Sequence, residues 1–217
     1  RVAEFRAPHL AQLDKRSRKV DWKTFVPADA SISVEASSKR SRVYHTGAIR
    51  QRIEDAVRDG VGCTIAGEGA DLVLRARLDN DLCTISIDTS GDPLHKRGFK
   101  QAVNKAPMRE TMAAQFLMAA GYEGNESVLD PMCGSGTFVI EAAEMALGLL
   151  PGRQRHFAFE KLAFFDAEAF AALKRTDNKE SELTFHGRDR DAGAIEMSQA
   201  NAGRAGVGSL THFESAA

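Results

Sequence analysis

The feature of this sequence that most limits its fold is a glycine-rich loop between a short apolar run and a helical pattern. Residues 127–130 read Ser-Val-Leu-Asp, which is typical of a short buried strand, and residues 131–137 continue Pro-Met-Cys-Gly-Ser-Gly-Thr. An apolar stripe at helical spacing follows, made of Phe138, Ala142, Met145 and Leu149. Glycines let a backbone approach a ligand closely, and free amides at a helix start attract carboxylates and other polar groups. The loop is therefore a candidate binding site.

Three nucleotide-binding patterns compete for this loop. A P-loop requires GxxxxGK[ST], which the sequence lacks. A dinucleotide fingerprint requires GxGxxG, but Val139 stands in place of the third glycine. An acid that precedes Gly-x-Gly, as Asp130 does here, fits S-adenosylmethionine better, because it can bind an ammonium or a hydroxyl group. The alternative without a ligand is a turn that needs glycine for packing alone.

A second acid follows the next predicted strand, where a ribose-binding carboxylate is expected. In a dinucleotide-binding fold, this acid comes roughly 20 residues after the glycines. Asp189 comes much later than that, so we expect an insertion that contains a helix at 166–175. Alternatively, Asp189 or Asp191 only caps the following helix. Two acids also permit both roles, with Asp189 on a ribose and Asp191 at the helix start.

The order of predicted elements divides the chain into two unlike parts. Up to residue 92 we expect a small α+β unit, with a strand at 31–36, a helix at 48–59 and a hairpin of 72–78 with 82–88. After it, helices are predicted at 107–121, 138–149, 166–175 and 192–205, and strands at 127–130, 183–187 and from 210. This alternation implies a parallel, doubly wound α/β sheet. The predicted domains are residues 1–92 and 93–217.

The formal net charge of −1 conceals two parts of opposite sign. Residues 1–52 carry 12 Lys and Arg against 5 Asp and Glu, whereas residues 111–217 carry 9 against 15. The basic stretch indicates a surface that faces a polyanion, although a lone basic cluster is more commonly a solvated face. With 43% hydrophobic residues, the composition is that of a globular chain rather than a disordered one.

The cysteines and the apolar runs exclude further classes. Cys63, Cys83 and Cys133 are scattered, which is typical neither of a disulfide framework nor of a zinc site. We expect a reducing, cytoplasmic location and no bound metal. No apolar run approaches the 18 residues or so that a membrane-spanning helix needs, so we expect no membrane partner.

Several segments, taken as an ordered set, resemble one family. They are 94–99 (Leu-His-Lys-Arg-Gly-Phe), 106–111 (Ala-Pro-Met-Arg-Glu-Thr), 130–143 and 187–191, preceded by 21–22 and 41–49. Together they are similar to the THUMP-containing class I S-adenosylmethionine-dependent RNA methyltransferases, close to the bacterial 23S rRNA guanine-N2 enzymes. The resemblance covers essentially the whole chain. It implies a THUMP-like RNA-binding domain followed by a Rossmann-like methyltransferase domain, with RNA as partner and rRNA favoured over tRNA.

The resemblance also implies which residues bind. The cofactor would be surrounded by Pro107, Met108, Asp130, Pro131, Met132, Cys133, Gly134, Ser135, Gly136, Thr137, Asp189 and Arg190. Within this set, residues 130–137 would hold the methionine part, Asp189 the ribose hydroxyls, and Arg190 would lie beside the adenine. An RNA-facing surface would contain Lys39, Arg40 and Arg42, extended near the active site by Lys96, Arg97 and Lys100.

One expected motif is missing. Family members that methylate an exocyclic base amine carry Asn/Asp-Pro-Pro-Tyr/Phe after the fourth strand, where it binds the amine and stacks on the flipped base. The six prolines, at 8, 27, 93, 107, 131 and 151, include no adjacent pair. We therefore expect the first part of a methyltransferase domain, name no catalytic residue, and expect no activity from this polypeptide alone. tRNA guanine N2, adenine N6 and a noncatalytic RNA-binding protein on the same scaffold stay open as alternatives.

Overall fold

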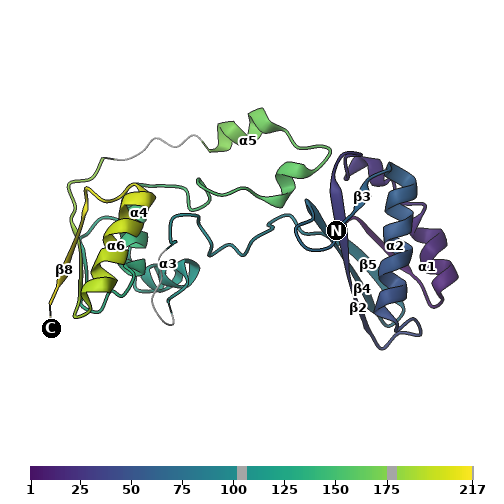
Figure 1. Ribbon diagram of the computed structural model, residues 1–217, viewed down its shortest axis with the longest axis horizontal. Helices are drawn as coiled ribbons and strands as arrows, with labels where there is room; N and C mark the ends of the chain where they lie inside the picture. Colours follow the sequence, from purple (N-terminus) through teal and green to yellow (C-terminus); the bar gives the residue numbers. More distant parts are fainter. Residues whose placement is uncertain (102–106, 175–179, 217) are drawn as a thin grey trace. The chain divides into compact units, whose positions relative to one another are not determined.

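The computed structural model describes residues 1–101, 107–174 and 180–216 (Figure 1). They form two compact units, the first made of Arg1–Gly91 with Phe157–Ala167 and the second of Asp92–His156 with Glu168–Ala217. The segment Phe157–Ala167 differs from the predicted division, which placed it in the second domain. It packs on the first unit because Leu162 enters the hydrophobic core there and the Phe159 amide donates to Thr89 O at 3.0 Å.

The first unit is a five-stranded sheet with two helices. Its elements are β1 (Ala3–Arg6), α1 (Leu10–Ser17), the short 3-10 helix η1 (Trp22–Thr24), β2 (Ser31–Lys39), α2 (Thr46–Val61), β3 (Thr64–Ile65), β4 (Leu72–Asp79) and β5 (Leu82–Ile87). The strand order is β1-β5-β4-β2-β3, with β2 parallel to β3 and β4, and β5 antiparallel to β1 and β4. The returning segment contributes the 3-10 helix η2 (Ala158–Lys161). The predicted α+β unit is confirmed.

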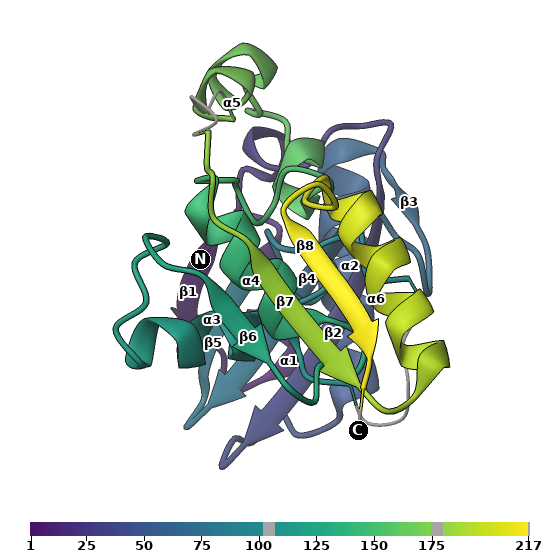
Figure 2. The same cartoon turned by 90° about the vertical axis from the view of Figure 1, so that its left-hand side faces the viewer.

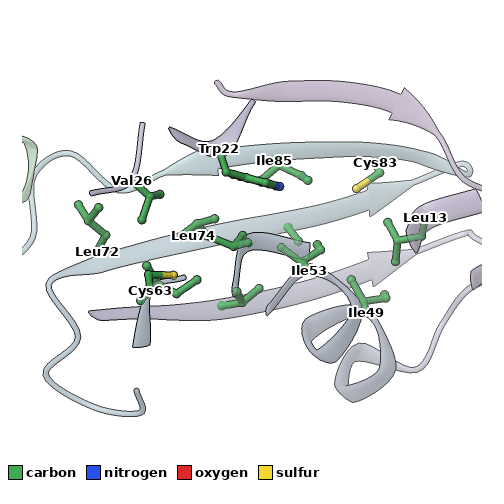
Figure 3. Close-up of a cluster of buried hydrophobic side chains, with 14 of the residues drawn as sticks. Leu13, Trp22, Val26, Ile49, Ile53, Cys63, Leu72, Leu74, Cys83 and Ile85 are labelled. Atoms are coloured by element: carbon green, nitrogen blue, oxygen red, sulfur yellow. The ribbon is translucent and has the colours of Figure 1, made fainter. Parts of the chain in front are cut away.

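Alternation along β4 and helical spacing along α2 create the core of the first unit. Leu72, Leu74 and Leu78 are fully buried and share one face of the sheet, because successive strand side chains point to opposite faces. From α2, Ile49 and Ile53 lie one turn apart and are also fully buried. Figure 3 shows the side chains of Leu72, Leu74, Ile49 and Ile53 between the sheet and the helix.

The second unit is a parallel sheet with helices packed on it. Its elements are α3 (Glu110–Ala119), β6 (Val128–Asp130), α4 (Thr137–Ala146), most of α5 (Ala167–Leu173), β7 (Phe185–Asp189), α6 (Ala192–Ala205) and β8 (Thr211–Ser215). The strands run parallel in the order β6-β7-β8 and lie side by side in Figure 2. Helix α4 packs against β6 and β7, with α3 and α6 as its neighbours. The predicted strand–helix alternation and parallel sheet are confirmed.

No helix among the described residues combines the length and the apolar character that a membrane crossing requires. Cys63, Cys83 and Cys133 are all buried as free thiols.

Candidate functional site

The glycine-rich loop connects β6 to α4, and its two glycines differ in how closely other atoms surround them. Gly136 has φ of +81°, and a Cβ there would come within 3.0 Å of the Ser198 Cβ and 3.2 Å of a Phe213 ring carbon. Gly134 has φ of +55°, but no atom lies within 4 Å of its would-be Cβ. Packing therefore explains Gly136 and does not explain Gly134. Open space beside Gly134 is what a loop that admits a ligand requires.

Two carboxylates lie where β6 and β7 end. Asp130 is paired in register with Gly187, so it stands two residues from Asp189 across the sheet edge. Asp189 Oδ2 accepts a hydrogen bond from the Gly134 amide at 3.0 Å, and Oδ1 accepts one from the Asp191 amide at 3.0 Å. These two bonds hold the pKa of Asp189 below its ordinary value. The sheet edge thus carries an ionised carboxylate fixed directly to the loop.

The pKa of Asp130 moves in the other direction. Burial raises it, and the nearby charge of Asp189 adds to the rise, although the Met132 amide donates to Asp130 Oδ1 at 3.0 Å and opposes it. A half-buried carboxylate with a raised pKa gains stability from a cationic or hydroxyl donor. Asp130 is therefore suited to an ammonium or hydroxyl group of a ligand.

The two proposed roles of the acid pair belong to different residues. Asp191 Oδ1 accepts from the Gly193 amide at 2.9 Å, which makes Asp191 the N-cap of α6. Asp189 is the last residue of β7 and bonds the loop. The capping alternative thus describes Asp191 and not Asp189.

Helix α6 holds the back of the loop with polar side chains that sequence reasoning missed. Ser198 Oγ donates to Gly134 O at 2.8 Å, and Asn201 Nδ2 donates to Ser135 O at 3.2 Å; both side chains are fully buried. The only sequence signal was two polar residues, spaced i and i+3, on the inward face of an apolar helix. Cys133 is buried beside Ser198, and burial raises the pKa of its thiol to about 11.

The segment at residues 107–108 is joined to the start of α4 by a lysine. Lys100 Nζ donates to Met108 O at 2.5 Å and to Thr137 Oγ1 at 2.7 Å. Burial lowers its pKa, while Glu110 and Glu141 oppose that effect. Lys100 was predicted on an RNA-facing surface; its ammonium group instead bonds inward and ties together two segments that were predicted to line the cofactor.

The prediction that Arg97 lies on an exposed RNA-facing surface is wrong. Its side chain is 6% exposed and forms an ion pair with Glu141 Oε2 at 2.9 Å. Burial raises the pKa of Glu141 to about 8, with Arg97 opposing the rise. The sequence showed a basic run, Lys96–Arg97, but not that α4 turns Glu141 and Glu144 toward it. Lys96 is exposed as expected and pairs with Asp92 at 3.1 Å.

A cavity of about 710 Å³ lies next to this ion pair, within the second unit. It is lined by Asp92, His95, Lys96, Arg97, Gly98, Lys100, Pro107, Met108, Arg109, Glu110, Gln154, Arg155 and His156. Met108 and Lys100 therefore connect the cavity to the glycine-rich loop. Of the remaining predicted cofactor residues, Pro107, Pro131, Met132 and Arg190 are exposed, whereas Ser135 and Thr137 are buried.

The basic cluster of the first unit is exposed, and its RNA-facing role stays a prediction. Lys39 ends β2, and the side chains of Arg40 and Arg42 are 63% and 71% exposed. Arg40 pairs with Asp79 at 3.3 Å and Arg42 with Asp81 at 3.8 Å across the β4–β5 turn.

Comparison with known proteins matches both units to described families. Residues 97–217 match the RMKL-like methyltransferase domain, and residues 8–88 match the THUMP domain. The chain is 36% identical over 227 residues to a protein of Psychromonas ingrahamii named ribosomal RNA large subunit methyltransferase K/L, and 32% identical over 229 residues to one of that name from Vibrio cholerae. These alignments cover 98% of this chain but 30% and 32% of the relatives, so the chain spans about a third of their length.

Solved structures agree with the fold. A Listeria monocytogenes protein described as a predicted N6-adenine-specific DNA methylase superposes with a TM-score of 0.85 at 30% identity, covering 99% of this chain and 59% of that one. A putative methyltransferase, SMU.472, crystallised with S-adenosylhomocysteine, gives 0.81 at 26% identity over 99% of this chain and 60% of its own. With its THUMP domain followed by a matching methyltransferase domain, the chain belongs to the RMKL-like methyltransferase family.

Proposed function

We propose that this chain supplies the RNA-binding and cofactor-binding parts of an S-adenosylmethionine-dependent RNA methyltransferase. In its most specific form, the proposal is methyl transfer to the N2 amine of a guanine in large-subunit rRNA. The observation that carries it is the pair Asp130 and Asp189 at one sheet edge, beside a loop that leaves open space at Gly134.

The residues of this edge fit the cofactor. Its methionine part has an ammonium and a carboxylate, and its ribose has two hydroxyls. Asp130, with its raised pKa, suits the ammonium, and the free amides at the start of α4 suit the carboxylate. Asp189 is ionised, and each of its oxygens has a lone pair left beyond the backbone bond it accepts, so it suits the ribose hydroxyls. The crystal of SMU.472 with S-adenosylhomocysteine supports the same cofactor.

When bound, S-adenosylmethionine supplies an electrophilic methyl group. The contribution of this chain is to orient its binding partners, which is worth several kcal/mol when the reacting atoms are aligned for in-line approach. Lys100 fixes residue 108 against the start of α4, and Ser198 fixes the loop from behind. With a pKa of about 11, the Cys133 thiol stays protonated at neutral pH, so no covalent role is assigned to it. No acceptor-binding catalytic residue is proposed among these 217 residues.

The first experiment is calorimetric titration of the chain with S-adenosylhomocysteine. Gly134→Val and Asp130→Ala should abolish binding, since the first fills the open space and the second removes the half-buried carboxylate. Gly121→Val is the matched control, because Gly121 also has positive φ (+84°) and open space around it but lies outside the loop. Unchanged affinity in both loop variants would exclude this cofactor site.

The second experiment identifies the acceptor. The full-length protein, incubated with labelled S-adenosylmethionine and undermodified 23S rRNA, should yield N2-methylguanosine on nucleoside analysis. Adenine N6 is the second candidate, favoured by the description of the Listeria structure as an N6-adenine DNA methylase, and it would yield N6-methyladenosine instead. We propose that the 217 residues alone give neither product, because they contain no Asn/Asp-Pro-Pro-Tyr/Phe.

A further inference from the structure

One exposed aromatic ring lies inside the basic cluster of the first unit. Tyr44 is 68% exposed, more than any other Phe, Tyr or Trp among the described residues. A single exposed aromatic side chain needs no ligand by itself. Tyr44 differs from an isolated ring because Arg40 and Arg42 precede it in the same loop and His45 follows it.

The ring of Tyr44 is supported on one side and anchored on both flanks. The His45 ring lies 4.4 Å from it, centroid to centroid, at an interplanar angle of 35°. The preceding residue, Val43, is 6% exposed in the core, and its carbonyl accepts from Ser38 Oγ at 2.7 Å. The carbonyl of His45 accepts from the Ile49 amide at 3.1 Å at the start of α2. The backbone on both sides of Tyr44 is therefore already fixed before a partner stacks on the ring, which lowers the entropy cost of binding.

The two arginines can exchange their present partners for phosphates. Arg40 and Arg42 pair with Asp79 and Asp81 at 3.3 Å and 3.8 Å, and in both pairs the arginine is exposed and the aspartate half-buried. Exposed pairs contribute little to stability and are screened by salt. The Arg42 amide, in contrast, donates to Asp81 Oδ1 at 2.8 Å, so the backbone is fixed while the guanidinium stays available.

We propose that Arg40, Arg42, Tyr44 and His45, here called the aromatic platform, bind an unpaired RNA segment, with one base stacked on Tyr44 and neighbouring phosphates on the arginines. This inference rests on the proposed function, since it takes RNA as the substrate. Aromatic rings stack on bases whose faces are free, and arginines bind the adjoining backbone. In a duplex both faces of each base are already covered, so the platform selects single-stranded RNA.

The test is fluorescence anisotropy of the chain with a labelled single-stranded RNA of about 12 nucleotides, and with the same strand annealed to its complement, over a range of salt concentrations. Tyr44→Ala should weaken single-strand binding by about 5- to 100-fold with an unchanged salt slope, and should leave duplex binding unchanged. Tyr44→Phe should bind like the wild type. Arg40→Gln with Arg42→Gln should instead reduce the salt slope, by about 0.7 for each lost phosphate contact.

Leu173→Ala is the matched control, since Leu173 is 77% exposed and lies outside the platform; it should bind both RNAs like the wild type. Wild-type affinity in Tyr44→Ala would overturn the inference. So would an equal loss on duplex RNA, or a Tyr44→Phe variant as weak as Tyr44→Ala, because neither follows from stacking. A wild-type chain that binds neither RNA would overturn the proposed function together with this inference, whereas the other outcomes leave the proposed function standing.

Discussion

Alanine substitutions at Gly136 and at Gly134 should separate two properties of the glycine-rich loop. The first should mainly lower stability, and the second should mainly lower ligand affinity. Both residues have positive φ, which costs an L-residue roughly 1–2 kcal/mol. At Gly136 the new Cβ would also lie 3.0 Å from the Ser198 Cβ, and overpacking of this kind costs about 1–3 kcal/mol. Gly136→Ala should therefore destabilise the second unit by about 2–5 kcal/mol, and Gly134→Ala by about 1–2 kcal/mol.

Urea denaturation measures this difference, and the chain contains its own internal reference. The single tryptophan, Trp22, is buried in the first unit, so its fluorescence reports the unfolding of that unit. Gly136→Ala should move the far-UV circular dichroism transition to lower urea and leave the Trp22 transition in place. Gly121→Ala, at φ of +84° with open space, supplies the cost of positive φ without a clash.

The affinity for S-adenosylhomocysteine, measured on the same variants, should depend on Gly134 rather than on stability. Gly134→Ala should match Gly121→Ala in stability but lose affinity for S-adenosylhomocysteine, because its new methyl group enters the open space. A Gly136→Ala protein as stable as Gly121→Ala would refute the packing argument. Unchanged calorimetric affinity in Gly134→Ala would refute the ligand argument.

Three further substitutions and one chemical reaction test the surroundings of the site. Because burial raises the pKa of Glu141 to about 8, its carboxyl binds a proton more tightly in the folded than in the unfolded protein. The free energy of unfolding should therefore fall as pH rises from about 4.5 to 8. Urea titrations of the Glu141→Gln variant should lack this contribution to the pH dependence. Arg97→Met should destabilise the second unit by about 3–5 kcal/mol at pH 8, where the unpaired Glu141 must take up a proton to stay buried, and by less at pH 5. Asp191→Ala should cost about 0.5–2 kcal/mol through the lost α6 cap, measured by the same denaturation. Cys133, buried with a pKa of about 11, should react with a thiol reagent at pH 8 only after urea is added; rapid labelling of the folded chain would contradict its burial.

The sequence predicted those parts of the fold that depend on local patterns. Alternation predicted β4, and helical spacing predicted α2 and α6, because burial of one face imposes a period on the chain. It did not predict β1 or α1. β1 has four residues and pairs only with β5, about eighty positions later, so its strand identity comes from a partner that local spacing does not reveal. The same reason explains why the return of residues 157–167 to the first unit went unpredicted.

In the candidate site, too, the sequence predicted what local patterns determine and missed what depends on tertiary contacts. The positions of Asp130, the glycines and Asp189 at strand ends and in a tight turn were predictable because such positions leave a sequence signature; their binding roles stay a prediction. Arg97 was wrongly predicted on an RNA-facing surface because a basic residue in the sequence does not reveal its ion-pair partner. That partner, Glu141, lies on another element.

Ser198 and Asn201 mark the part of the site that a sequence search could have recovered. Burying a polar side chain on the inward face of a helix costs free energy unless the side chain forms a hydrogen bond. The apolar spacing of the helix alone would predict an apolar residue at both positions. Their two acceptors are carbonyl groups of the loop, Gly134 O and Ser135 O. Helix α6 therefore buries two polar side chains, and their hydrogen bonds hold one side of the loop. The space on the other side of Gly134 stays open. We predict that these two hydrogen bonds hold the loop backbone in place for a ligand, in addition to stabilising the fold.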